Sequence, residues 1–175
     1  MATGENDDFY AVVSYCSAVA CSTGILPVPQ TAQRPDTDQT SVPKETTMRI
    51  EHAGIQVAKP GEMGDWYVKN LGFTIKRAAE SPVPVRFIAD QSGKVMLEIY
   101  NNPKVAPPDY FKVDPLFLHI AFVCDDVPGT MKRLIDAGAT QHAPVENTPA
   151  GDTLVFLRDP WGMAIQLCQR AKPMV

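Results

Sequence analysis

The sequence predicts an α+β protein made of two βαβββ modules in tandem, which form a curved, barrel-like mixed sheet with the helices outside. Two observations predict this class. The same order of strand-like and helix-like patterns occurs twice, in residues 48–101 and 116–170. Landmark residues of the two copies are also separated by offsets that stay between 66 and 69 residues, as in an internal repeat. These landmark pairs are His52 and His119, Gly72 and Gly138, Asp90 and Asp159, and Glu98 and Gln166.

The first module begins with a strand over 49–57 and continues with a helix over 61–71. Apolar residues recur at helical spacing in the helix, and Gly72 just beyond it suits a left-handed cap. Alternating apolar residues between turn residues then predict strands over 73–77, 85–89 and 94–100. The apolar helix residues are Met63, Trp66, Tyr67 and Leu71.

The second module begins with a strand over 116–124, whose apolar run predicts that it is buried. The pair Asp125-Asp126 is a good N-cap for the helix that follows, with Pro128 in its first turn, and the helix is expected to end at Gly138. The remaining strands are expected over 139–143, 154–157 and 163–169.

The first 47 residues have a different composition, rich in Ser, Thr, Gln, Asp and Pro. Such a segment buries too little apolar surface to offset the entropy of ordering, so a flexible tail is expected. Met48 is an alternative natural start. The expected organisation is a tail over 1–47 and a domain over 48–172, in which a module over 48–101, a linker over 102–115 and a module over 116–170 follow one another.

The formal net charge of −4 argues against nucleic acid or an anionic membrane as a partner. All of it lies in residues 1–47, which leaves 14 basic and 14 acidic residues in the rest of the chain. The cysteines lack metal-type spacing, which favours small core residues in a reducing cytoplasm. A secretory segment over 11–20 is the weaker alternative, because acidic residues precede it.

Each module carries a potential metal ligand on its first and its fourth strand. These are His52 and Glu98 in the first module and His119 and Gln166 in the second. A single histidine in a core strand is usually satisfied by a hydrogen bond, but matching positions in two copies favour a shared ion. Two imidazoles, a carboxylate and an amide oxygen suit one divalent transition metal, namely Zn, Ni, Mn or Fe.

Several motifs resemble those of the vicinal oxygen chelate superfamily, which includes glyoxalase I, bleomycin-resistance proteins and extradiol dioxygenases. The resemblance covers about residues 48–170. It rests on His52, Glu98 and His119, on the Y-x-x-x-L-G-F pattern of Tyr67 to Phe73, and on the run from Phe156 to Leu167, which is similar to the family's D-P-x-G-x-x-x-E-L ending.

Similarity to glyoxalase I implies that His52, Glu98, His119 and Gln166 hold the metal. Gln166 departs from the pattern, because it replaces a carboxylate that often acts as the general base. An amide accepts no proton at neutral pH, so Glu98 is the candidate catalytic base. Gln56 occupies a position where bacterial glyoxalases usually have an arginine for glutathione, which leaves the co-substrate open. The implied activity is that of a metal-dependent lyase or isomerase, similar to lactoylglutathione lyase, on a small substrate with vicinal oxygens.

Two alternatives stay open at this point. One is a non-catalytic small-molecule binding protein of the bleomycin-resistance type, and the other is an extradiol-type Fe(II) dioxygenase that uses His52, His119 and Glu98. A homodimer is expected, because modules of two chains often pair in this superfamily and a βαβββ sheet leaves edges to cover. The candidate substrate-binding residues are Tyr100, Trp161 and Arg158.

Overall fold

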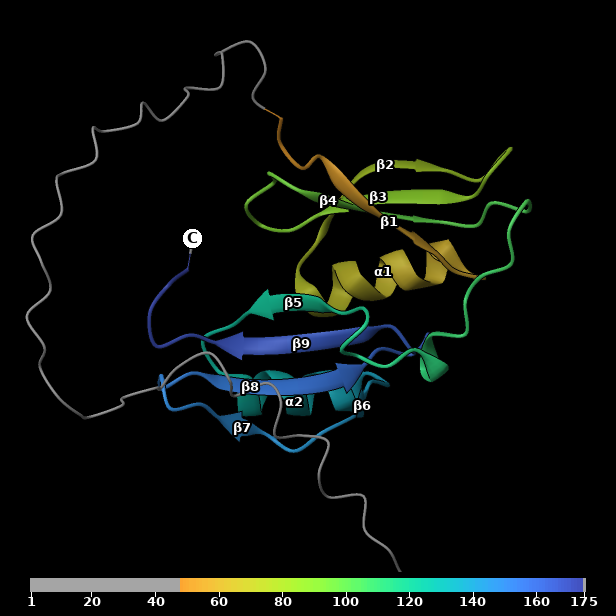
Figure 1. Cartoon of the computed structure of the whole chain (residues 1–175). Coiled ribbons are helices and arrows are strands. Elements are labelled where there is room, and N and C mark those ends of the chain that lie inside the picture. Colours follow the sequence, from red (N-terminus) through yellow and green to blue (C-terminus); the bar gives the residue numbers. More distant parts are fainter. Residues whose placement is uncertain (1–47, 175) are drawn as a thin grey trace, which may run out of the picture. The chain divides into compact units, whose positions relative to one another are not determined.

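Two mixed sheets, each with a helix against one face, make up the computed structural model over the residues that it describes, 48–174 (Figure 1). The tail expected over 1–47 lies outside these residues. The order of elements confirms the predicted α+β class and the repeated strand–helix–strand arrangement. The two sheets are curved but do not close into a single barrel.

The first sheet has the strand order β1-β4-β3-β2, with β1 parallel to β4 and the other pairs antiparallel. Its helix, α1, begins with Pro60, whose missing N–H costs nothing in the first turn. Gly72 ends the helix in the left-handed conformation (φ 72°), as predicted. The elements are β1 (His52–Gln56), α1 (Pro60–Leu71), β2 (Thr74–Ala79), β3 (Val85–Ala89) and β4 (Met96–Tyr100).

The second sheet has the strand order β5-β9-β8-β6, and β7 also pairs with β8. The carboxylate of Asp126 accepts a hydrogen bond of 3.0 Å from the N–H of Gly129, so Asp126, the second residue of the predicted pair, is the N-cap of α2. The elements are β5 (Ile120–Val123), α2 (Val127–Asp136), β6 (Thr140–Gln141), β7 (Glu146–Asn147), β8 (Thr153–Arg158) and β9 (Ala164–Gln169).

Side chains alternate along each strand, so each sheet has one face covered by a helix and one face left open. The covered face of each sheet carries buried side chains, such as Ile99 in the first sheet and Leu167 in the second. The strand register places two other sets of residues on the uncovered faces. The open face of the first sheet has His52, Gly54, Phe87, Met96, Glu98 and Tyr100; the open face of the second has His119, Ala121, Val123, Leu154, Phe156 and Gln166.

The helix α1 packs on the first sheet and also contacts the second half of the chain (Figure 1). The indole Nε1 of Trp66 donates a hydrogen bond of 2.8 Å to the carbonyl of Ala137. Tyr67 is fully buried, as expected for a core residue, and its ring lies edge-on to Phe122 of β5. Both hydrophobic clusters of the core include Trp66 and Phe122 at their margins. The helix therefore occupies the space between the two sheets.

The first strand of the second sheet begins later than predicted, at Ile120 rather than at residue 116. Asp114 causes the difference, because it forms a turn in which its carboxylate accepts from the N–H of Leu116 and its backbone carbonyl accepts from the N–H of Phe117. Phe117 is 88% exposed and Val123 73% exposed, so the predicted burial of this strand is wrong at both ends. Apolar composition identified the strand but not which face is covered.

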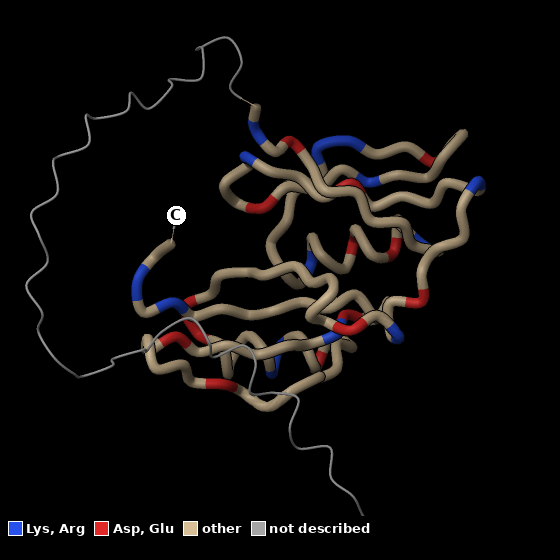
Figure 2. Tube along the Cα trace, in the orientation of Figure 1, with Lys and Arg blue, Asp and Glu red and all other residues tan. Residues whose placement is uncertain are grey.

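Acidic and basic residues are both spread over the described chain (Figure 2). No helix among residues 48–174 has both the length and the apolar character required to cross a bilayer.

Candidate metal centre

His52 and Glu98 meet on the open face of the first sheet. They lie on the parallel neighbours β1 and β4, and the Nε2 atom of His52 is 3.4 Å from the Oε2 atom of Glu98. Both side chains are about one-third exposed, so a ligand can reach them from solvent. These are the two candidate ligands that the sequence assigns to the first module.

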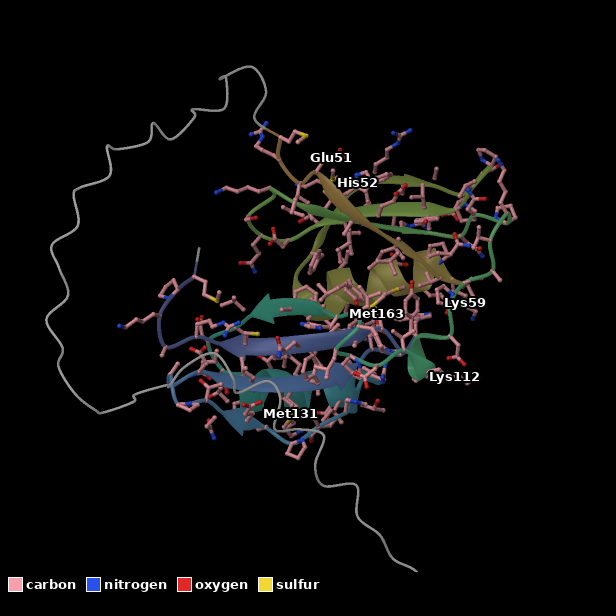
Figure 3. The ribbon with its side chains drawn as sticks, viewed as in Figure 1. Glu51, His52, Lys59, Lys112, Met131 and Met163 are labelled. Carbon is pink, nitrogen blue, oxygen red and sulfur yellow. The ribbon has the colours of Figure 1, made fainter. Side chains whose placement is uncertain are left out.

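The imidazole of His52 has neighbours that fix its orientation. Its Nδ1 atom contacts the carboxylate of Glu51, the residue directly before β1 (Figure 3). Its ring lies edge-on to Phe87 of β3, with 5.6 Å between ring centroids and an interplanar angle of 88°. Of the two ring nitrogens of His52, Nδ1 faces Glu51 and Nε2 faces Glu98.

Gly54 leaves room beside Glu98. It is the register partner of Glu98, and a Cβ atom there would lie 3.5 Å from Oε2 of Glu98 and 3.3 Å from Cε1 of Tyr100. A larger side chain would fill the space in which an ion could sit between Glu98 and His52. The corresponding position in the second sheet is Ala121, which is the register partner of Gln166 and is also small.

His119 repeats the arrangement of His52 on the second sheet. Its Nδ1 atom lies 2.7 Å from the carbonyl oxygen of Pro115, and its ring lies edge-on to Phe156, with centroids 5.1 Å apart and an angle of 86°. Gln166 lies on the same face, where its Oε1 atom accepts a hydrogen bond from the thiol of Cys168. The two halves of the chain therefore carry candidate ligands at matching positions, which we call half-sites: His52 and Glu98 form the first half-site, and His119 and Gln166 form the second.

A single chain does not bring the two half-sites together. Among residues 48–174, no three His, Cys, Asp or Glu side chains are close enough to hold one ion. His119 therefore does not join His52 and Glu98, and the expected convergence within one chain is not met. The physical reason is that α1 lies between the sheets (Figure 1) and each open face is the one away from the helix.

The first half-site nevertheless has the chemistry and spacing of metal ligands. Two ligands bonded to one ion at about 2.1 Å, at angles from about 90° to about 109°, lie about 3.0 to 3.4 Å apart. The separation of 3.4 Å between His52 and Glu98 falls within this range. An imidazole nitrogen and a carboxylate suit Zn, Ni, Mn or Fe better than Ca or Mg.

The three candidate substrate-binding residues lie in different surroundings. Tyr100 is on the open face next to Glu98 and lines a pocket of about 300 Å³ together with Lys104 and Val105. Trp161 is half-buried and packs against the core, with its ring 6.4 Å from that of Trp66. The guanidinium of Arg158, a residue that is 7% exposed, donates to three backbone carbonyls. Two of these carbonyls, those of Tyr110 and Val113, belong to the linker over residues 102–115, which we call the connector. Arg158 therefore fixes the connector between the two sheets.

Sequence reasoning missed three residues of the half-sites. Glu51 precedes His52 directly, and Phe87 and Phe156 are separated by the same 69 residues as Asp90 and Asp159. The repeat offset was therefore a signal that could have found the two aromatic residues. Gln56 stands where bacterial glyoxalases usually have an arginine for glutathione. Here its side-chain amide binds the connector, because it both donates to and accepts from the backbone of Asn102.

The repeated strand–helix–strand order, with His52 on β1 and His119 directly before β5, is typical of the vicinal-oxygen-chelate class. A family model described as "Glyoxalase/Bleomycin resistance protein/Dioxygenase superfamily" matches residues 49–167. The chain belongs to this superfamily, which confirms the resemblance found in the sequence. No curated protein matches the sequence significantly.

Solved structures of this superfamily have a similar fold. TnmS3, an antibiotic binding protein from Streptomyces sp. CB03234, is 22% identical, with a TM-score of 0.56 over 72% of this chain and 98% of that chain. A superfamily member from Sphaerobacter thermophilus is 20% identical, with a TM-score of 0.55 over 71% and 98%. A glyoxalase I mutant from Zea mays is 22% identical, with a TM-score of 0.57 over 71% of this chain and 46% of that chain. At these identities the similarity shows the fold alone.

Proposed function

We propose that this protein is a metal-dependent lyase or isomerase that acts on a small substrate with vicinal oxygens. The observation that carries the proposal is the separation of 3.4 Å between His52 Nε2 and Glu98 Oε2 on an open sheet face. His119 and Gln166 occupy the matching positions on the other sheet.

The two free thiols among the described residues, Cys124 and Cys168, favour a reducing cytoplasm as the location of the protein.

A homodimer would complete the centre. In a twofold pair, the open face of the first sheet of one chain covers the open face of the second sheet of the other, and the reverse contact forms a second, identical site. Each site then takes His52 and Glu98 from one protomer and His119 and Gln166 from its partner. The exposed apolar side chains of Phe117 and Val123, and the unpaired edges of β1 and β5, support this arrangement.

The bound metal ion would polarise the oxygens of the substrate as a Lewis acid. Glu98 is the candidate base, because Gln166 has no proton-accepting group at neutral pH. Tyr100 lies beside Glu98, so its side chain can orient the part of the substrate next to the reacting carbon. Phe87 and Phe156 would exclude water from opposite sides of the closed site.

Metal content tests the proposal directly. Full-length protein without a His tag is purified and analysed by inductively coupled plasma mass spectrometry, before and after reconstitution with each candidate metal. We expect about one ion per chain in the wild type and a large loss in His52→Ala, with Lys59→Ala, an exposed residue away from the site, as the control. A wild type that neither contains nor takes up a divalent metal rules out the proposed enzyme.

Mixed dimers test the shared site. His52→Ala and His119→Ala chains are each expected to bind no metal alone. When equal amounts exchange subunits, half of the dimers carry one chain of each kind, and in those dimers one site has both histidines, so about one site in four regains metal. A site formed within a single chain would regain none.

A non-catalytic binding protein is the second candidate function. The pocket of about 300 Å³ beside Tyr100 and the aromatic open faces favour it. In that case EDTA would leave the thermal stability of the protein unchanged, while an aromatic ligand would raise it. The enzyme proposal predicts a lower melting temperature with EDTA.

A further inference from the structure

We propose that Glu51 is a positioning residue for His52, and that its carboxylate directs the Nε2 lone pair of the imidazole to the metal position. Nothing in the sequence pattern pointed to Glu51. The inference rests on the proposed metal centre and identifies the residue that prepares it for the ion. The contact that carries it is the one between Glu51 Oε2 and His52 Nδ1.

The hydrogen-bonding capacity of the two groups determines the tautomer. A carboxylate only accepts hydrogen bonds, so the Nδ1 atom that contacts Glu51 must carry the proton. In the neutral imidazole, Nε2 then has a free lone pair. The Nε2 atom lies 3.4 Å from Glu98 Oε2, which is also an acceptor. Two acceptors at this separation repel each other unless a cation, either a proton or a metal ion, lies between them.

The backbone holds Glu51 in place although its side chain is 70% exposed. The carbonyl of Glu51 accepts a hydrogen bond of 2.9 Å from the N–H of Met96, at the start of β4. This bond belongs to the parallel pairing of His52 with Met96 and fixes the backbone of Glu51 directly before β1. The Glu51 side chain lies beside that of His52 (Figure 3). Phe87 limits rotation of the ring from the other side.

The second half-site provides an internal control for this interpretation. His119 Nδ1 is held at 2.7 Å by the carbonyl of Pro115, which also can only accept. Each Nδ1 atom therefore faces an acceptor, which a side chain provides for His52 and a backbone carbonyl provides for His119. The two contacts favour the same Nδ1–H tautomer.

The experiment compares Glu51→Ala and Glu51→Gln with Glu62→Ala in the full-length protein. Glu62 lies on α1 and pairs with Lys59 at 2.9 Å, so its removal changes the net charge equally but away from the site. Zinc affinity is measured by competition with a chromophoric chelator. Loss of a group that orients a metal-bound histidine typically weakens binding by about 10- to 100-fold. We expect this loss in Glu51→Ala, a smaller loss in Glu51→Gln because its amide oxygen still accepts, and wild-type affinity in Glu62→Ala.

A second readout needs no metal. Two-bond ¹H–¹⁵N correlation spectra of the metal-free protein at about pH 8 report which ring nitrogen of His52 is protonated. We expect the Nδ1–H form in the wild type and in Glu62→Ala, and a mixture of both forms in Glu51→Ala. If the wild type binds no zinc, the proposed function fails and the spectra alone decide the role of Glu51. If it binds zinc and Glu51→Ala matches Glu62→Ala in affinity and spectrum, the inference is overturned.

Discussion

The hydroxyl of Tyr67 donates a hydrogen bond of 2.9 Å to Oδ2 of Asp159, across 92 positions of sequence. The contact joins α1 to the turn between β8 and β9, and both side chains are buried. The other oxygen of Asp159 accepts the backbone N–H groups of Trp161 and Met163, each at 2.9 Å. Burial raises the pKa of Asp159 to about 6, from a usual value of 3.8.

This raised pKa predicts a pH-dependent stability. Because the pKa of Asp159 is higher in the folded protein than in the unfolded chain, its contribution is fully present below about pH 3.8 and is lost as the pH rises through about 6. The free energy of unfolding should fall by on the order of 3 kcal/mol across this window from Asp159 alone. Urea denaturation between pH 4 and 7.5 measures it.

Asp159→Asn separates this group from the others that titrate. The amide keeps an oxygen for the backbone N–H groups but carries no charge, so the variant should lack this part of the pH dependence. At pH 7.5 it should be at least as stable as the wild type. Parallel pH curves for the two proteins would contradict the prediction.

Gly162 should tolerate no side chain. It has a φ of 86°, and a Cβ atom there would lie 2.7 Å from both the backbone nitrogen and the ring of Phe111. Gly93 has a φ of 64° with no atom within 4 Å of a Cβ, so it isolates the conformational cost. We expect a loss of roughly 1 kcal/mol in Gly93→Ala and of at least roughly 3 kcal/mol in Gly162→Ala. Urea denaturation measures both, and equal losses would show that the contact with Phe111 is unimportant.

Arg158 should be needed for an ordered connector. Arg158→Met leaves the carbonyls of Tyr110, Val113 and Gly162 without their donor, which should lower the free energy of unfolding by about 3 kcal/mol. Limited proteolysis should also cut faster within the connector, residues 102–115. The matched control is Arg77→Met, an exposed position on β2. Similar cleavage rates in the two variants would argue against this role.

Gln166→Glu should strengthen metal binding. A carboxylate is a better ligand than an amide for a divalent ion, so we expect roughly 10-fold higher zinc affinity with little change in stability. Gln91→Glu makes the same charge change in an exposed turn and should have no effect. Equal zinc affinities for the two variants, measured by chelator competition, would exclude Gln166 as a ligand.

The sequence predicted local structure well where a single residue determines the backbone conformation or caps a helix. The β3 strand matches its predicted bounds, α1 begins one residue earlier than predicted, and Asp126 and Gly72 cap the two helices as expected. The start of β5 was wrong, because a hydrophobic pattern does not reveal that Asp114 ends the connector in a turn. The role of Arg158 was equally hidden, since its partners are backbone carbonyls far along the chain.

The sequence alone determined the repeat, the fold class and the four candidate ligands, because strand periodicity and landmark spacing are local properties of the chain. Only the tertiary structure decided which of these ligands meet. The hydrophobic face of α1 packs against both halves of the chain, so the two half-sites lie on separate open faces, and His52 is brought to Glu98 but not to His119. Long-range packing of this kind depends on the shapes of buried side chains, which a one-dimensional pattern does not contain.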